Sequence, residues 1–313
     1  MKELRIAILK TLCYADVFDF PLKKEEIVRY LIKSSKLKYQ NSPAGRGRPL
    51  DEVVLWTKKL IKTEKIKEKD NFYFLRGREK IVETRKKREK ESRKKLEIAK
   101  RTAGFLKIIP TVKMVAVTGA LAMNNSKKED DIDFLIVSEK NRLWITRFLA
   151  TILMEIFGKR RRPKNKNITD KICLNMFLDE EHLTVLQKEQ DLFTAHEVIQ
   201  LKPLWEKDNI YQKFLIANKW VEEFLGNAIV KLQNSKIPKF QNKKFLALSW
   251  NCKLCTLSFA LFENALKHFQ LFYMRKRRTT EVISDNIIRF HPKDARVWVL
   301  KKYQERIKKW CLN

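Results

Sequence analysis

The sequence predicts an α+β protein in which a small mixed sheet is followed by a helical C-terminal region. Three observations support this fold class. The 313 residues include only 7 Gly and 8 Pro, which argues against a loop-rich all-β protein. Hydrophobic residues make up 44% of the chain, enough for the cores of two or three modest domains. Helical spacing of apolar residues dominates, and only a few short apolar runs are typical of buried strands.

Residues 1–78 are expected to form a small N-terminal domain of three helices followed by a hairpin. This is the element order of a winged helix, which often places its third helix on DNA or RNA. Such modules also serve as protein-contact or packing units, so both roles stay open. The expected helices end near residue 16 and cover residues 24–32 and 51–63, and the expected strands cover 65–69 and 71–75. The lysines that would form its basic face are Lys58, Lys59, Lys62, Lys65, Lys67 and Lys69.

Residues 79–106 are predicted to form one long connector helix. Its central run, residues 85–95, contains eight basic and two acidic side chains, while its apolar residues lie at the two ends. Most charge runs are solvated helix faces, and this one is interpreted as a positive rod between domains that widens a footprint for phosphate backbones.

Residues 107–180 are predicted to hold the sheet, and residues 181–313 are expected to be helical throughout. In the first segment the expected strands are 112–118, 132–137 and 171–178, with a helix over 142–157. In the second segment the expected helices are 183–201, 210–225, 244–274 and 295–311.

Charge and cysteine usage narrow the class of partners and the compartment. Lys and Arg number 68 against 37 Asp and Glu, a formal net charge of +31, which attracts polyanions such as RNA or DNA. The five cysteines are scattered and odd in number, which indicates a reduced, cytoplasmic protein. No stretch offers the ~20 mostly apolar residues that a bilayer needs, so no membrane contact is expected.

The most informative segment is 117–137, VTGALAMNNSKKEDDIDFLIV. An apolar strand ends in a turn at Gly119, and a second strand begins at the Asp131-Ile132-Asp133-Phe134 sequence. Strand alternation should place Asp131 and Asp133 on one face of the sheet, with Ile132 and Phe134 on the other. Two carboxylates on one face are costly without a cation, and hard oxygen ligands suit Mg²⁺. Gly119 would let the backbone approach a triphosphate.

This segment resembles the DNA polymerase β-like nucleotidyltransferase superfamily. The family motif is a hydrophobic residue, Gly and Gly or Ser, a short spacer, and then Asp, a hydrophobic residue and a second acidic residue. The chain matches it at the first strand, at Gly119 and at Asp131 and Asp133. Ala120 stands where Ser or Gly is usual, so the backbone donors remain without a hydroxyl. A third carboxylate of the family corresponds here to Asn175, with Asp170 as an alternative.

The resemblance implies a function and a set of site residues. Asp131 and Asp133 are the expected catalytic carboxylates and would bind one or two Mg²⁺ ions together with Asn175. Thr118, Gly119, Ala120 and Arg147 would contact the nucleotide, and a basic cluster at 159–162 would steady its phosphates. The expected reaction transfers a nucleoside monophosphate from a nucleoside triphosphate to an acceptor hydroxyl, which the sequence does not identify.

Two other functions stay open. The first is a winged-helix nucleic-acid-binding protein whose nucleotidyltransferase core is inactive; Ala120 and Asn175 favour it, whereas the intact Asp131 and Asp133 favour the enzyme. The second is a protein-interaction scaffold with an incidental motif. It predicts neither nucleotide binding nor salt-dependent RNA or DNA binding.

Overall fold

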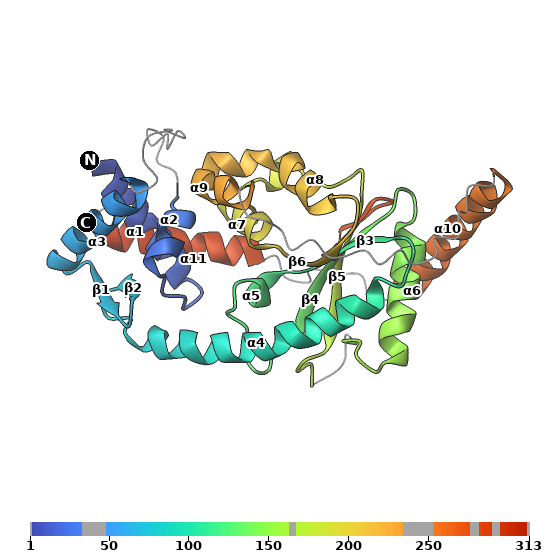
Figure 1. The fold of residues 1–313 in the computed structure, drawn as a ribbon, viewed down its shortest axis with the longest axis horizontal. Helices are drawn as coiled ribbons and strands as arrows, with labels where there is room; N and C mark the ends of the chain where they lie inside the picture. The colour runs from blue at the N-terminus through green and yellow to red at the C-terminus, as the bar shows by residue number, and fades with distance from the viewer. Residues whose placement is uncertain are drawn as a thin grey trace.

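The fold is α+β, with an elongated shape in which a helical N-terminal part and a sheet-containing part lie side by side (Figure 1). The computed structural model describes residues 2–32, 48–162, 167–233, 253–275, 282–289 and 295–311. No helix in these ranges is long and apolar enough to cross a membrane. The mixed α+β class expected from the sequence is confirmed.

The N-terminal part has the predicted order of three helices and a hairpin. The hairpin pairs Ile66 with Leu75 and Lys69 with Phe72, and the segment before the second helix joins it through two backbone hydrogen bonds between Leu22 and Tyr73, at 3.0 and 2.8 Å. Its elements are α1 (Lys2–Asp16), α2 (Lys24–Arg29), α3 (Arg48–Lys62), β1 (Ile66–Lys69) and β2 (Phe72–Leu75).

Helix α4 (Lys80–Leu106) is the expected connector and runs along one side of the molecule between the two parts (Figure 1). It is not a uniformly solvated rod. The guanidinium of Arg85 is buried and lies 3.6 Å from the centroid of the Phe20 ring. It also contacts Glu26 at 2.8 Å and the carbonyl of Pro21 at 2.9 Å. A buried charge needs partners, and Arg85 finds them in the N-terminal part. It therefore attaches the connector helix to that part.

A six-stranded mixed sheet forms the centre of the second part. Its order is β6-β3-β4-β5-β8-β7; β4 and β5 are parallel and the other neighbours are antiparallel. The strands are β3 (Val112–Val117), β4 (Ile132–Ser138), β5 (Ile172–Asp179), β6 (Lys202–Glu206), β7 (Val282–Ile283) and β8 (Ile287–Arg289).

The expectation of an entirely helical region after residue 180 is wrong, because three of these strands come from it. β6 and β7 are the two edges of the sheet, where short strands and a proline such as Pro203 are tolerated. The helices around them are α7 (Leu192–Gln200), α8 (Ile210–Ala217), α9 (Glu222–Gln233), α10 (Lys253–Met274) and α11 (Ala295–Trp310), with short 3₁₀ turns at Gln187–Glu189 and Lys219–Val221.

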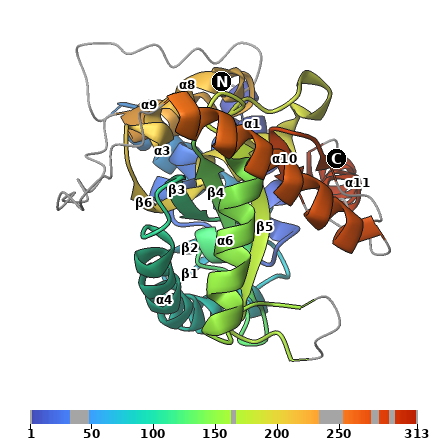
Figure 2. The same cartoon turned by 90° about the vertical axis from the view of Figure 1, so that its right-hand side faces the viewer.

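The two faces of the sheet pack against different helices. Leu135 and Val137 point toward α1, α7 and α11 and belong to one core, whereas Phe134 and Ile136 belong to a second core with α4 and α6 (Leu143–Ile156). Figure 2 shows α6 and α10 together on the outer side of the sheet. Because residues alternate along β4, Asp133 faces the same side as Leu135 and is directed toward α1 and α7.

Candidate active site at a cavity between the sheet, α1 and α7

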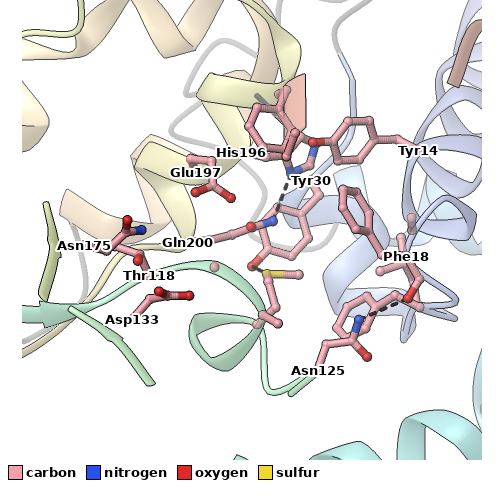
Figure 3. A pocket seen from close by; sticks show the side chains of 18 of the residues that line it. Tyr14, Phe18, Tyr30, Thr118, Asn125, Asp133, Asn175, His196, Glu197 and Gln200 are labelled. Atoms are coloured by element: carbon pink, nitrogen blue, oxygen red, sulfur yellow. Dashed lines mark hydrogen bonds between the residues drawn. The ribbon is translucent and has the colours of Figure 1, made fainter. Parts of the chain in front are cut away.

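A cavity of about 380 Å³ lies where the sheet meets the N-terminal part (Figure 3). This volume is within the range of small-molecule sites. One end, here called the polar end, is formed by Thr118, Gly119, Asp133, Arg161 and Asn175. The other, the aromatic end, is formed by Tyr14, Phe18, Phe20, Tyr30, Phe193 and His196.

The paired aspartates are brought together as the sequence predicts. Ligand atoms of Asp131, Asp133 and Cys173 all lie within 4.8 Å of one another, a group able to hold a metal ion. Asp133 and Cys173 are register partners on the parallel strands β4 and β5, which explains why the thiol joins the carboxylates. Asp133 lines the cavity, while Asp131 and Cys173 lie directly beside it.

The turn between β3 and β4 adopts the expected sharp geometry. Gly119 has a φ of +60°, a backbone conformation that residues other than glycine rarely adopt. A Cβ at this position would lie 3.5 Å from Oδ2 of Asp133, so the turn passes close to the carboxylate. Thr118 donates its backbone N–H to the carbonyl of Asp133 at 3.1 Å. Thr118, Gly119 and Ala120, the residues expected to contact a nucleotide, all line the cavity. The helix after the turn, α5 (Gly119–Ala122), has only four residues.

Asn175 reaches the cavity through an irregularity in β5. Phe134 pairs with Leu174 and Leu135 pairs with Met176, so Asn175 is an extra residue on that strand. Such a bulge redirects side chains near functional sites. The side chain of Asn175 is buried and lines the polar end, as expected for a residue placed beside Asp133.

The two aspartates are electrostatically strained. Burial, and then the neighbouring Asp131, raise the pKa of Asp133 to about 7. Oδ2 of Asp131 is buried and accepts no hydrogen bond from any described residue. Nη1 of Arg161 lies 2.8 Å from this oxygen, close enough for an ion pair but not aligned as a hydrogen bond, and the same nitrogen donates to Sγ of Cys173 at 3.6 Å. A cation between the carboxylates would relieve this strain.

Glu197 is a carboxylate at this site that the sequence analysis missed. It projects from α7 into the cavity, on the side facing Asp133 (Figure 3). Burial, and then Asp133, raise its pKa to about 7. The available signal was an acidic residue within the apolar helical sequence LFTAHEVIQ, which alone does not reveal its partner.

Two predicted residues are not brought to the site. Arg147 lies on α6, donates to Oε1 of Gln270 on α10 and does not line the cavity. Asp170 forms an ion pair with Lys95 at 2.7 Å and is also outside the lining. Of the basic cluster at 159–162, Arg161 lines the cavity, whereas Arg160 and Arg162 pair with Glu155.

The loop that leads into Asp131 is fixed from α4. The ammonium of Lys95, almost fully buried, donates to the carbonyls of Lys128 and Asp130 at 3.0 and 2.7 Å and to Asp170. Lys95, from the basic run of α4 that was expected to be solvated, thus positions the loop before β4. This contact depends on tertiary packing, which spacing within α4 does not show.

The aromatic end contains one unpaired polar atom. His196 is 4% exposed, and its ring stacks on Tyr14 with centroids 4.0 Å apart and planes 9° from parallel. The amide of Gln200 faces Nδ1 at 3.1 Å, and Nε2 is buried without a hydrogen-bond partner among the described residues. Burial lowers the pKa of His196 to about 3, so the ring is neutral at pH 7.

No protein-family model, curated protein or solved structure matches the chain. Its function is therefore inferred from the cavity and from the short motif that forms the polar end.

Proposed function

We propose that the chain is a Mg²⁺-dependent nucleotidyltransferase that moves a nucleoside monophosphate from a nucleoside triphosphate to an acceptor hydroxyl. The observation that supports this proposal is the Asp131 and Asp133 pair beside a glycine turn in a cavity. Burial and Asp131 raise the pKa of Asp133, and Oδ2 of Asp131 is paired with Arg161 but accepts no aligned hydrogen bond from a described residue. A polar end with these groups suits a polyphosphate chelated to a divalent cation.

The available ligand atoms favour a hard cation. Asp131 and Asp133 supply carboxylate oxygens, and Asn175 supplies an amide oxygen. Cys173 adds a sulfur atom to this group, but sulfur is a soft ligand, and Mg²⁺ prefers oxygen. Bound Mg²⁺ would supply positive charge to the phosphate oxygens and increase the acidity of the acceptor hydroxyl.

Two side chains would then act on the substrates. Arg161, which pairs with Asp131 in this structure, is placed to exchange that carboxylate for a phosphate oxygen. Glu197 supplies the proton acceptor that the amide of Asn175 is unable to provide. The acceptor oxygen attacks the α-phosphorus, its proton passes to Glu197, and the bond to the bridging oxygen breaks to release pyrophosphate.

The test is a transfer assay with α-labelled nucleoside triphosphates, Mg²⁺ and separate RNA, protein and small-molecule pools from the source cells. We expect label in one pool, a loss of about 10³-fold in Asp131→Ala/Asp133→Ala because the charge stabilisation supplied by a metal is worth several kcal/mol, and a large loss in Glu197→Gln. Glu129→Gln is the matched control, since Glu129 is exposed in the same loop and does not line the cavity. No transfer from a folded wild type to any pool would contradict the proposal.

A second candidate is a nucleic-acid-binding protein with an inactive core. Lys58, Lys59 and Lys62 are exposed on α3, whereas the hairpin lysines Lys67 and Lys69 are engaged by Glu79 and Glu83 at 3.6 and 3.7 Å. This function predicts salt-dependent RNA or DNA binding that weakens in Lys58→Ala/Lys62→Ala and is unchanged in Asp131→Ala/Asp133→Ala. Binding that is insensitive to salt and to the α3 lysines would exclude it.

A further inference from the structure

The aromatic end and the polar end belong to one continuous cavity (Figure 3). A ligand that fills it would carry anionic groups near Arg161, joined to Asp133 through a cation, and a flat, largely apolar group at the other end. The flat group would lie among aromatic rings contributed by α1, by the segment before α2 and by α7. Aromatic side chains bind nucleobases by stacking, whatever the base.

His196 adds a directional contact to these rings. Its Nδ1 faces the amide nitrogen of Gln200 and accepts from it, so Nε2 carries the ring proton. That N–H is buried beside the cavity and no described residue accepts it. An unpaired buried donor is costly, and a ligand with a ring nitrogen or carbonyl oxygen would satisfy it.

The contacts around Phe18 hold the aromatic end against the sheet domain. Asn125 donates to the backbone carbonyl of Phe18 at 3.1 Å, and Arg88 of α4 donates to the same carbonyl at 3.0 Å. Asn125 itself follows the glycine turn of the polar end and lines the cavity. The distance between the two ends is therefore fixed by direct contacts between the N-terminal part and the turn.

We infer that the aromatic end binds the base of the nucleotide and that the Nε2–H of His196 donates a hydrogen bond to an acceptor atom of that base. This inference rests on the proposed function, because the triphosphate must lie at the polar end. It assigns the N-terminal part a role in nucleotide binding that is separate from any contact with nucleic acid. Stacking supplies affinity for any base, and His196 fixes the orientation of the ring.

The inference is tested by comparing two ligands in the presence of Mg²⁺: α,β-methylene ATP, which has a base, and inorganic tripolyphosphate, which has none. Calorimetry should show that the wild type binds the nucleotide at least about tenfold more tightly. His196→Phe keeps a ring against Tyr14 but removes the donor; it should lose about tenfold for the nucleotide and nothing for tripolyphosphate.

Two further variants test the stacking contribution and control for indirect effects. Phe18→Leu, which removes a ring but no polar atom, should weaken nucleotide binding several-fold and leave tripolyphosphate unchanged. Tyr303→Phe is the matched control, because Tyr303 packs on Tyr14 with ring centroids 5.6 Å apart but does not line the cavity; its affinities should equal those of the wild type. Near-ultraviolet circular dichroism confirms that each variant is folded.

Binding data separate the base-binding inference from the proposed transferase function. Equal affinity for nucleotide and tripolyphosphate, with both lost in Asp133→Asn, would overturn the inference and leave the metal-polyphosphate site in place. Unchanged nucleotide affinity in both His196→Phe and Phe18→Leu would also overturn it. Binding of neither ligand by the folded wild type would overturn the proposed function and this inference together.

Discussion

The polar end and the aromatic end of the cavity are built by opposite means. The polar end comes mainly from one contiguous segment and its parallel neighbour β5, and it buries like charges beside one another. The aromatic end joins α1 to α7, about 180 residues apart in the sequence, and it buries neutral rings stacked on one another. Burial of the carboxyl groups at the polar end therefore costs folding free energy, whereas the rings of the aromatic end contribute to the core.

This contrast indicates which end of the cavity lowers the free energy of unfolding and which end raises it. Burying two adjacent carboxyl groups is unfavourable, as the raised pKa of Asp133 shows, and Oδ2 of Asp131 has an ion pair with Arg161 but no aligned hydrogen bond. The rings of Tyr14 and His196, by contrast, would be a stable core element in any protein. Substitutions at the two ends should therefore change stability in opposite directions.

The largest effect on stability is expected for Asp133→Asn in the presence of a chelator at pH 8. The folded-state pKa of Asp133 is raised from 3.8 to about 7, so the folded chain holds its proton more tightly than the unfolded chain. Stability is therefore lost as pH rises from about 4 to about 7, on the order of 4 kcal/mol in total. Urea unfolding should show the variant to be more stable than the wild type by roughly that amount.

The control for this experiment is a neighbouring carboxylate with the opposite role. Oδ2 of Asp130 accepts from the backbone N–H of Lys127 at 2.7 Å, so Asp130→Asn should destabilise the chain by about 1 kcal/mol. Added Mg²⁺ should stabilise the wild type and have no such effect on Asp133→Asn. Equal stability of wild type and Asp133→Asn at pH 8 would show that the pair is not strained.

His196 should give a pH dependence of opposite sign. Its pKa is lowered from 6.5 to about 3 in the folded state, so only the unfolded chain takes up this proton near pH 5. Its contribution is fully present above about pH 6.5 and is lost as pH falls toward 3; between pH 7 and 5 the loss is about 2 kcal/mol. His196→Phe should lack this part of the decline, whereas Tyr303→Phe should retain it. Identical pH profiles for wild type and His196→Phe would contradict the prediction.

Lys95 tests whether the polar end depends on support from α4. Lys95→Met removes the ammonium that donates to the carbonyls of Lys128 and Asp130 and to Asp170, and should cost about 1.5 kcal/mol of unfolding free energy. The adjacent Lys94 is exposed and pairs only with Glu91 among the described residues, so Lys94→Met should change stability by less than about 0.5 kcal/mol. Lys95→Met should also weaken transfer, since the loop before Asp131 loosens. A variant as stable and active as Lys94→Met would show that the contact is dispensable.

The same contrast explains what the sequence alone could reveal. Asp131 and Asp133 were predictable because strand alternation and a nearby glycine turn are local properties, and the structure confirms that they come together. Glu197 and His196 were not, because each belongs to an apolar helix and reaches the site only when α7 packs over the sheet. The local sequence pattern therefore identified the polar end of the cavity and missed the aromatic end.

Two wrong predictions from the sequence, the placement of Arg147 and the absence of strands after residue 180, have the same physical origin. Arg147 and Arg161 are both cations near the second strand of the motif, but α6 turns Arg147 toward α10, and only the loop residue reaches the cavity. β6 and β8 are short strands that join the sheet by pairing with β3 and β5, about 90 and 110 residues earlier in the chain, so no local periodicity marks them as part of the sheet. Both outcomes depend on tertiary contacts rather than on residue type.

The smallest effect is expected for Gly119→Ala, which probes the glycine turn directly. A φ of +60° is strained for alanine, at a cost of about 1 kcal/mol, and the added methyl group would point toward Oδ2 of Asp133 at 3.5 Å. Gly104→Ala is the matched control: that glycine lies inside α4 with nothing within 4 Å of an added Cβ, so alanine should stabilise the helix by about 0.5–1 kcal/mol. The midpoint of thermal unfolding should therefore fall for Gly119→Ala and rise for Gly104→Ala. Only Gly119→Ala should also weaken binding of tripolyphosphate in Mg²⁺, because only its methyl group enters the polar end; a stable Gly119→Ala with full binding would mean that the turn does not approach the ligand.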